Sequence, residues 1–200
     1  MAVKILLASS NPGKLAEFQA LASGSSILIE LGLMPNFESI PIFDESAPTF
    51  AENSLGKAFY YSQHTQELML ADDSGLVVPS LGGRPGVHSA RYAGENATSA
   101  KRVEKLLEEM RGKSWDEREA HFVCALSLVK NNKALCVISA RTDGQILESQ
   151  RGAGGFGYDP IFFFLPLNKS FAELSPEEKN LHSHRGRAFR RLLGVLPDML

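Results

Sequence analysis

The sequence predicts an α/β fold, because short apolar runs of strand length alternate with stretches whose apolar residues recur at helical spacing. Residues 3–8 and 27–31 are strand-like runs, and the apolar residues of 15–22 between them repeat at the spacing of a buried helix face. Residues 118–142 alternate as an antiparallel hairpin does, with Asn131 and Asn132 at its turn. We therefore expect a sheet flanked by helices.

The composition is that of an ordinary globular domain. Of the 200 residues, 44% are apolar and 22% are charged, so we expect one domain over residues 1–200 with a sizeable core. A net charge of −2 gives no general electrostatic footprint for nucleic acid or for an anionic membrane. No apolar run reaches about 18 residues, so we expect no membrane span and a cytoplasmic protein.

The two cysteines, Cys124 and Cys136, lie on the two predicted strands of the hairpin. Their spacing matches no metal-binding motif. We expect both to be free thiols, which fits a reducing compartment.

The end of the first predicted strand has the make-up of a phosphate-binding turn. Residues 3–8 run directly into Ser9, Ser10, Asn11, Pro12, Gly13 and Lys14. Asn11 suits a helix N-cap and Pro12 the first helical position, so N–H groups, two hydroxyls and the charge of Lys14 gather at a helix start. The alternative is a capped helix with a solvated lysine. The turn lacks the residues of a P-loop.

A capping box at Thr49 and Glu52 predicts a second helix through about residue 62, with Asn53 and Lys57 on one face. Glu45 precedes this helix in a loop rich in proline. It is either solvated or a ligand, and spacing alone does not decide between the two.

Two adjacent carboxylates form the most distinctive motif. We expect a short strand over residues 68–71 to end at Asp72 and Asp73, and a second apolar run follows at 76–78. Neighbouring carboxylates are costly unless a cation lies against them, and hard oxygen ligands suit Mg²⁺. A solvated turn is the alternative. The glycine-rich loop that follows, over residues 82–86, is of a kind that often approaches a ligand.

A second glycine-rich loop spans residues 152–160 and carries two aromatic residues and an aspartate. Glycine lets the backbone approach a ligand, and Phe156 or Tyr158 can stack on a planar ring. The alternative is a glycine-rich turn plugged by an aromatic side chain.

Ser175 and Glu178 form another capping box and predict a last helical region. On one straight helix the side chains of Lys179, His184 and Arg185 would fan around the axis. They are therefore either solvated, or the helix breaks near Gly186 and they converge.

Read together, these motifs occur in an order that resembles the Ham1/inosine triphosphatase family. The stretches that carry the resemblance are SSNPGK, TFAENSLGKA, ADDSGL, LGGRPGVHSARYAG, GGFGYDPIF and SHRGRAF. They span nearly the whole chain. The family usually has Thr-Gly-Asn at positions 9–11. Here Ser9 keeps the hydroxyl, whereas Ser10 in place of glycine bears on how closely phosphate approaches the backbone.

The resemblance implies an elongated mixed sheet with flanking helices, two lobes around a central active-site cleft, and a homodimer. It implies hydrolysis of ITP, dITP or XTP to monophosphate and pyrophosphate with Mg²⁺. Asp73 would be the catalytic carboxylate, with Glu45 and Asp72 beside it at the metal. The residues that would bind substrate are Ser9, Ser10, Asn11, Pro12, Gly13, Lys14, Lys57, Ser74, Phe156, Gly157, Tyr158, Asp159, Lys179, His184 and Arg185.

Lysine and arginine donors would favour the 6-keto acceptor of these bases over the 6-amino donor of adenine. Three other functions stay open. The chain could be a pyrophosphatase of the Maf type acting on pyrimidine or modified nucleotides, a nucleotide-binding sensor without turnover, or an interaction protein. The DDSG and SHR motifs disfavour the first, and the number of loop glycines and carboxylates disfavours the last.

Overall fold

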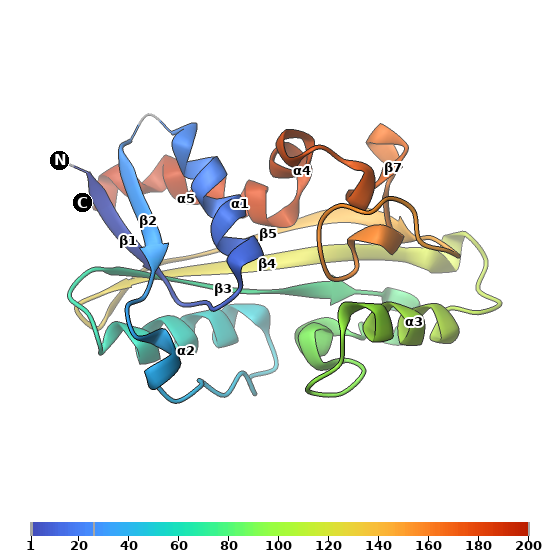
Figure 1. Ribbon diagram of the computed structural model, residues 1–200, viewed down its shortest axis with the longest axis horizontal. Coiled ribbons are helices and arrows are strands. Elements are labelled where there is room, and N and C mark those ends of the chain that lie inside the picture. Colours follow the sequence, from blue (N-terminus) through green and yellow to red (C-terminus); the bar gives the residue numbers. More distant parts are fainter. Residues whose placement is uncertain (1, 26, 200) are drawn as a thin grey trace. The chain divides into compact units, whose positions relative to one another are not determined.

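A seven-stranded mixed sheet forms the centre of the fold, in the strand order β2-β1-β3-β4-β5-β6-β7 (Figure 1). The computed structural model describes residues 2–25 and 27–199. Strand β1 pairs in parallel with β2 and β3, and β6 pairs antiparallel with β5 and β7. The strands are β1 (Val3–Leu7), β2 (Ile29–Leu33), β3 (Leu68–Val77), β4 (Glu119–Lys130), β5 (Lys133–Ile146), β6 (Phe162–Phe164) and β7 (Lys169–Ser170).

Five α-helices flank these strands among the described residues, which confirms the predicted α/β class. They are α1 (Pro12–Ser23), α2 (Phe50–Ser62), α3 (Ser99–Glu109), α4 (Pro176–His182) and α5 (His184–Val195). None of these helices has the length and apolar character needed to cross a bilayer.

The chain divides into two compact units, and strands β3, β4 and β5 contribute residues to both. The first unit comprises Met1–Asp73, Cys124–Ala140 and His184–Leu200, and the second comprises Ser74–Val123 and Arg141–Ser183. The single domain expected over the whole chain stays a prediction, and so do the two lobes and the cleft.

In the first unit, helices α1 and α5 cover one face of the sheet and α2 covers the other (Figure 1). Strand β3 shows why, because its successive side chains point to opposite faces. Leu68 and Leu70 belong to the cluster beneath α1 and α5, whereas Met69 and Ala71 belong to the cluster beneath α2. The strand is therefore buried on both sides.

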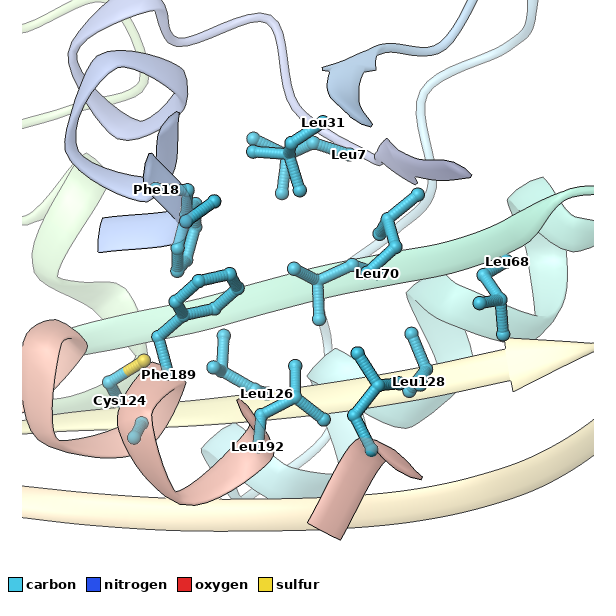
Figure 2. Packing of buried hydrophobic residues seen from close by; sticks show 14 of the residues in the cluster. Leu7, Phe18, Leu31, Leu68, Leu70, Cys124, Leu126, Leu128, Phe189 and Leu192 are labelled. Atoms are coloured by element: carbon cyan, nitrogen blue, oxygen red, sulfur yellow. The ribbon is translucent and has the colours of Figure 1, made fainter. Parts of the chain in front are cut away.

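Two phenylalanines join α1 to α5 in the first of these clusters. Figure 2 shows Phe18 of α1 facing Phe189 of α5, and the ring centroids lie 5.1 Å apart. Leu70, Leu126 and Leu192 complete the contact from β3, β4 and α5. Each fully buried side chain of this size contributes about 1.5–3 kcal/mol to folding.

The second unit has its own core, in which aromatic rings predominate. Phe122 of β4 and Phe162 of β6 pack at 4.6 Å between ring centroids, and Phe171 stacks on Phe122 at 5.8 Å. Leu106 of α3 and Ile146 of β5 are fully buried in the same cluster. This core supports the loop that carries Phe156.

The predicted caps and turn are present. Asn11 and Thr49 accept backbone hydrogen bonds at the starts of α1 and α2, and Ser175 forms a capping box with Glu178 at the start of α4. Asn131 and Asn132 both have positive φ, as a two-residue turn between β4 and β5 requires. Both cysteines are free thiols, as expected.

The helix break expected near Gly186 lies three residues earlier. Ser183 has an extended backbone between α4 and α5, and its N–H closes α4 by donating to the Lys179 carbonyl at 2.8 Å. Serine is a preferred residue at such a helix start. Gly186 therefore lies in the first turn of α5.

Two strand glycines give a matched test of this packing. A Cβ at Gly144 of β5 would lie 2.4 Å from the backbone oxygen of Phe163, whereas a Cβ at Gly32 of β2 would have nothing within 4 Å. We expect Gly144→Ala to lower the free energy of unfolding by about 1–3 kcal/mol and Gly32→Ala to leave it nearly unchanged. Urea denaturation measures both, and equal effects would contradict the packing described here.

Candidate active site

Asp72 and Asp73 lie in the middle of β3, where the sequence had suggested the end of a strand. The expected run over residues 68–71 and the one at 76–78 belong largely to one strand, Leu68–Val77. Because successive side chains of a strand point to opposite faces, the two carboxylates enter different surroundings. Asp72 meets side chains of α1 and α5, and Asp73 lies near Glu45 and Lys57 on the side of α2.

Asp72 is the buried counter-ion of two cations. Its side chain is fully buried, and its Oδ2 lies 2.9 Å from the Lys14 Nζ and 3.2 Å from the Arg185 Nε. The Cys124 thiol lies 3.3 Å from the other carboxylate oxygen. Burial opposes ionisation, but Lys14 and Arg185 hold the pKa of Asp72 well below its usual range. The carboxylate expected at the metal is thus engaged by protein cations.

Glu17 is a charged residue of this network that sequence reasoning missed. Its Oε2 lies 2.6 Å from the Arg185 Nη1, so Arg185 bridges Asp72 and Glu17. Glu17 follows Lys14 by three residues and shares its face of α1. The spacing of three residues from Lys14 is the sequence feature that could have identified Glu17. The two carboxylates balance the charges of Lys14 and Arg185.

The start of α1 is more fully capped than the sequence suggested. The Asn11 Oδ1 accepts hydrogen bonds from the N–H groups of Gly13 at 2.9 Å and Lys14 at 3.3 Å. The Ser9 Oγ accepts from the Asn11 N–H at 3.1 Å. Three donors of the turn therefore have protein acceptors. Ser10 and Asn11 are exposed, and Pro12 occupies the first helical position.

Asp73 has a buried oxygen without a protein partner. It is 6% exposed, and its Oδ2 makes no hydrogen bond within the described part of the chain. Burial, and then the neighbouring charge of Glu45, raise the pKa of Asp73 to about 6. A carboxylate of this kind can accept a proton near neutral pH or bind a cation.

Lys57 of α2 stands between the acidic groups on this side. Its Nζ forms an ion pair with Glu45 and donates to the backbone oxygen of Asp72 at 2.8 Å. Burial opposes its charge, but Glu45 raises the pKa of Lys57 above its ordinary value. The Asn53 side chain makes two hydrogen bonds to the backbone of Ala47, at 2.9 and 3.2 Å, and so fixes the loop near Glu45.

The carboxylates of Asp73 and Glu45 fit a divalent cation in their chemistry. The unpartnered oxygen of Asp73 supplies a hard ligand, and a cation would relieve the repulsion that raises its pKa. Within residues 2–25 and 27–199, no three His, Cys, Asp or Glu side chains gather as a complete metal site. Mg²⁺ commonly uses one or two carboxylates together with substrate phosphates.

In the second unit, Phe156, Asp159 and Lys179 form one interlocked group. The Asp159 Oδ2 accepts from the Phe156 N–H at 2.8 Å and from the Lys179 Nζ at 2.7 Å. The same Nζ lies 4.5 Å from the centre of the Phe156 ring. Asp159 and Lys179 are buried, while 36% of Phe156 is exposed. An aromatic surface is thus held beside a lysine.

Gly155 occupies a position in this loop where a side chain would not fit. It has a φ of +69°, and a Cβ there would lie 2.1 Å from the Asp159 Oδ2. Gly157 also has positive φ. Tyr158, the next residue, is only 4% exposed. Of the two aromatic residues considered for stacking, Phe156 is the exposed one. Ser74 lies on β3 with intermediate exposure.

The residues expected to converge at the end of the chain fall in different units. Lys179 belongs to the second unit, and His184 and Arg185 open α5 in the first. His184 and Arg185 are buried, with 4% and 3% of their surface exposed. Their convergence with Lys179 stays a prediction.

The fold and these two groups define an α/β protein with a buried carboxylate site and a lysine-flanked aromatic surface. Known proteins are similar to this chain in sequence and fold. The model of the Ham1 family matches residues 5–195. A dITP/XTP pyrophosphatase of Geobacillus kaustophilus is 46% identical over 189 residues, covering 94% of this chain and 92% of that protein.

Solved structures agree with this relationship. A HAM1 protein from Coxiella burnetii superposes with a TM-score of 0.86 at 40% identity, covering 98% of this chain and 99% of that one. The Staphylococcus aureus Ham1 protein gives a TM-score of 0.85 at 34% identity, with 98% of each chain covered. This chain belongs to the Ham1 family.

The raised pKa of Asp73 should make the free energy of unfolding depend on pH. The folded pKa is about 6 and the ordinary value is 3.8, so the folded state binds this proton more tightly than the unfolded chain. Ionisation of Asp73 therefore lowers the free energy of unfolding between about pH 4 and pH 6, by an amount on the order of 1–3 kcal/mol.

Asp73→Asn should remove that loss and make the metal-free protein more stable than wild type at neutral pH. Urea denaturation in EDTA, at about pH 4 and about pH 7, measures the effect as a difference between the two proteins. A difference that does not change with pH would contradict the assignment.

Proposed function

We propose that this chain hydrolyses the non-canonical purine nucleoside triphosphates dITP, XTP and ITP to the monophosphate and pyrophosphate. The observation that carries the proposal is Asp73, a buried carboxylate with an unpartnered oxygen and a pKa raised to about 6. The relative from G. kaustophilus, whose name is dITP/XTP pyrophosphatase, supplies the substrate class.

The triphosphate chain binds at the start of α1 in this proposal. Lys14 supplies a cation there, and its contact with Asp72 uses one of the three N–H groups of its ammonium. The hydroxyls of Ser9 and Ser10 add donors. Because Asn11 already accepts two N–H groups of the first turn, a phosphate reaches them only by sharing or replacing that cap. Lys57 adds a second cation beside Glu45.

Asp73 and Glu45 would hold Mg²⁺, and Asp72 would serve as the counter-ion of Lys14 and Arg185. Bound Mg²⁺ would neutralise the charge of the phosphates and lower the pKa of a coordinated water. Of the three carboxylates first considered for the metal, Asp72 has the weakest support, because its side chain is fully buried against two protein cations.

Asp73 acts as the general base. Its Oδ2 makes no hydrogen bond among the described residues, so this oxygen can accept a proton. It takes one proton from the attacking water, a new P–O bond forms, and the bond joining the α and β phosphates breaks. Pyrophosphate leaves and the nucleoside monophosphate remains.

The base binds on the exposed ring of Phe156, beside Lys179. The Lys179 ammonium is a donor, so a 6-keto oxygen satisfies it and a 6-amino group does not. A site built in this way can discriminate against adenine, because a 6-amino group would place a donor against a donor. Asp159 holds Lys179 in place through an ion pair of 2.7 Å. The family resemblance also implies roles in base recognition for His184 and Arg185, which open α5 in the first unit.

We also propose a homodimer in the cytoplasm, built from single-domain subunits over residues 1–200 and acting on free nucleotides. The free thiols support a reducing compartment. The net charge of −2 supports a function without nucleic acid or a membrane surface as partner.

A nucleotide panel tests this function directly. With Mg²⁺ we expect pyrophosphate release from dITP, XTP and ITP at rates far above those for ATP, UTP and dTTP. Chromatography should show monophosphate as the nucleotide product. Asp73→Asn should lower turnover by at least about 10²-fold, because it removes the general base.

Each alternative has its own outcome in that panel. Preference for UTP or dTTP would indicate a Maf-type enzyme, and binding of ITP without turnover would indicate a sensor. Diphosphate with orthophosphate as products would refute the proposed bond cleavage.

The different roles of the two aspartates can be separated by metal binding. Asp72→Asn leaves Lys14 and Arg185 without a shared counter-ion, so it should cost about 3 kcal/mol of stability and leave Mn²⁺ affinity near that of wild type. Asp73→Asn should weaken Mn²⁺ binding at least about tenfold without that loss of stability. Mn²⁺ titration followed by electron paramagnetic resonance measures the affinities. Equal losses in the two variants would make Asp72 a ligand.

A further inference from the structure

Ser89 is a buried residue to which the proposed function gives no role. It lies in the 3-10 helix Gly86–Arg91, which follows the glycine-rich loop after β3. Its Oγ accepts from the Leu76 N–H at 2.9 Å and donates to the Gly86 carbonyl at 2.7 Å. Leu76 lies on β3, three residues after Asp73. The Ser89 hydroxyl thus connects the 3-10 helix to β3 through a hydrogen bond.

The backbone of Ser89 holds the loop that carries Phe156. The Tyr158 hydroxyl donates to the Ser89 carbonyl at 3.0 Å, with both residues buried. A buried tyrosine hydroxyl needs such a partner, and the ring packs in the aromatic core of the second unit. Ser89 therefore contacts β3 through its side chain and the loop that carries Phe156 through its carbonyl.

Tyr158 is placed to fix the whole aromatic surface. It stands between Phe156 and Asp159, which are joined by a hydrogen bond of 2.8 Å. Asp159 in turn holds Lys179 at 2.7 Å, and Lys179 lies over the Phe156 ring. These contacts link the ring, the carboxylate and the ammonium into one group. The Tyr158 hydroxyl ties that group to Ser89.

We propose that Ser89 and Tyr158 are positioning residues for purine recognition, acting through Phe156 and Lys179. Tyr158, which the family resemblance lists among the substrate-binding residues, is 4% exposed and would act in this way without touching the nucleotide. The inference rests on the proposed function, in which Phe156 and Lys179 bind the base. Discrimination between a 6-keto and a 6-amino group requires that the Lys179 ammonium cannot move away from an unsuitable partner. Loss of the hydrogen bond from Tyr158 to Ser89 would allow the Lys179 ammonium to move and would therefore weaken selectivity.

Tyr158→Phe removes one oxygen and keeps the ring in the core, and Tyr92→Phe is its matched control. Tyr92 is 8% exposed in the same cluster, and its hydroxyl donates to the Glu109 Oε2 at 2.6 Å and not to the Ser89 carbonyl. We expect each variant to lower Tm by about 2–4 °C, as the loss of one buried hydrogen bond does.

Kinetics with dITP and dATP should separate the two variants. Tyr158→Phe should raise KM for dITP about tenfold with kcat within about twofold, because a ground-state contact is weakened. That change corresponds to about 1.4 kcal/mol. The reaction with dATP should change less, so the ratio of the two kcat/KM values should shrink by about 5–10-fold. Tyr92→Phe should leave KM and the ratio unchanged.

Two further measurements keep the inference testable whatever the fate of the proposed function. Hydrogen exchange of residues 152–159, measured by mass spectrometry, should speed up in Tyr158→Phe and not in Tyr92→Phe. Ser89→Ala, which keeps the carbonyl and loses the contact with β3, should change exchange and selectivity in the same direction by a smaller factor.

The outcomes are distinct. An unchanged dITP to dATP ratio in Tyr158→Phe, or an equal change in Tyr92→Phe, would overturn the positioning role, and so would unchanged exchange of the loop. Failure of the wild-type protein to release pyrophosphate from dITP or XTP would refute the proposed function instead. In that case hydrogen exchange alone decides whether Tyr158 anchors the loop.

Discussion

The fully buried carboxylate of Asp72 is the constraint on which the first unit depends. A single oxygen within 3.2 Å of both Lys14 and Arg185 joins α1, β3 and α5 at one point. Such a group is stable only if its charge is matched, because an unpaired charge in the interior costs several kcal/mol. Glu17 balances the second cation, so the network is nearly neutral. The Phe18–Phe189 contact holds the same two helices together.

The neighbouring aspartate shows how a strand separates two roles. Asp72 and Asp73 are adjacent in the chain, yet protein cations lower the pKa of the first, while burial and Glu45 raise the pKa of the second to about 6. Two like groups with divergent pKa values are a feature of catalytic sites. The alternation of side chains along β3 produces the difference, since one face meets α1 and α5 and the other meets α2.

Much of the local structure was predictable from residues near one another in sequence. The caps at Asn11, Thr49 and Ser175 and the turn at Asn131 and Asn132 depend on side chains within three positions of the groups they bind. The family resemblance likewise rests on contiguous motifs. The end assigned to the strand at Asp72 was wrong, because carboxylates in mid-strand are tolerated only with partners supplied from elsewhere in the chain.

The α/β class, most helix starts, the hairpin and the set of candidate residues could therefore be predicted from the residues alone. The partner of each charged group became known only from the folded arrangement: Lys14 pairs with Asp72, Lys57 with Glu45, and Lys179 with Asp159. Only the structure showed that Tyr158 bonds to Ser89, 69 positions away. The physical reason is that hydrogen bonds and charges act through space over a few ångströms, whereas a sequence motif contains only residues that are neighbours along the chain.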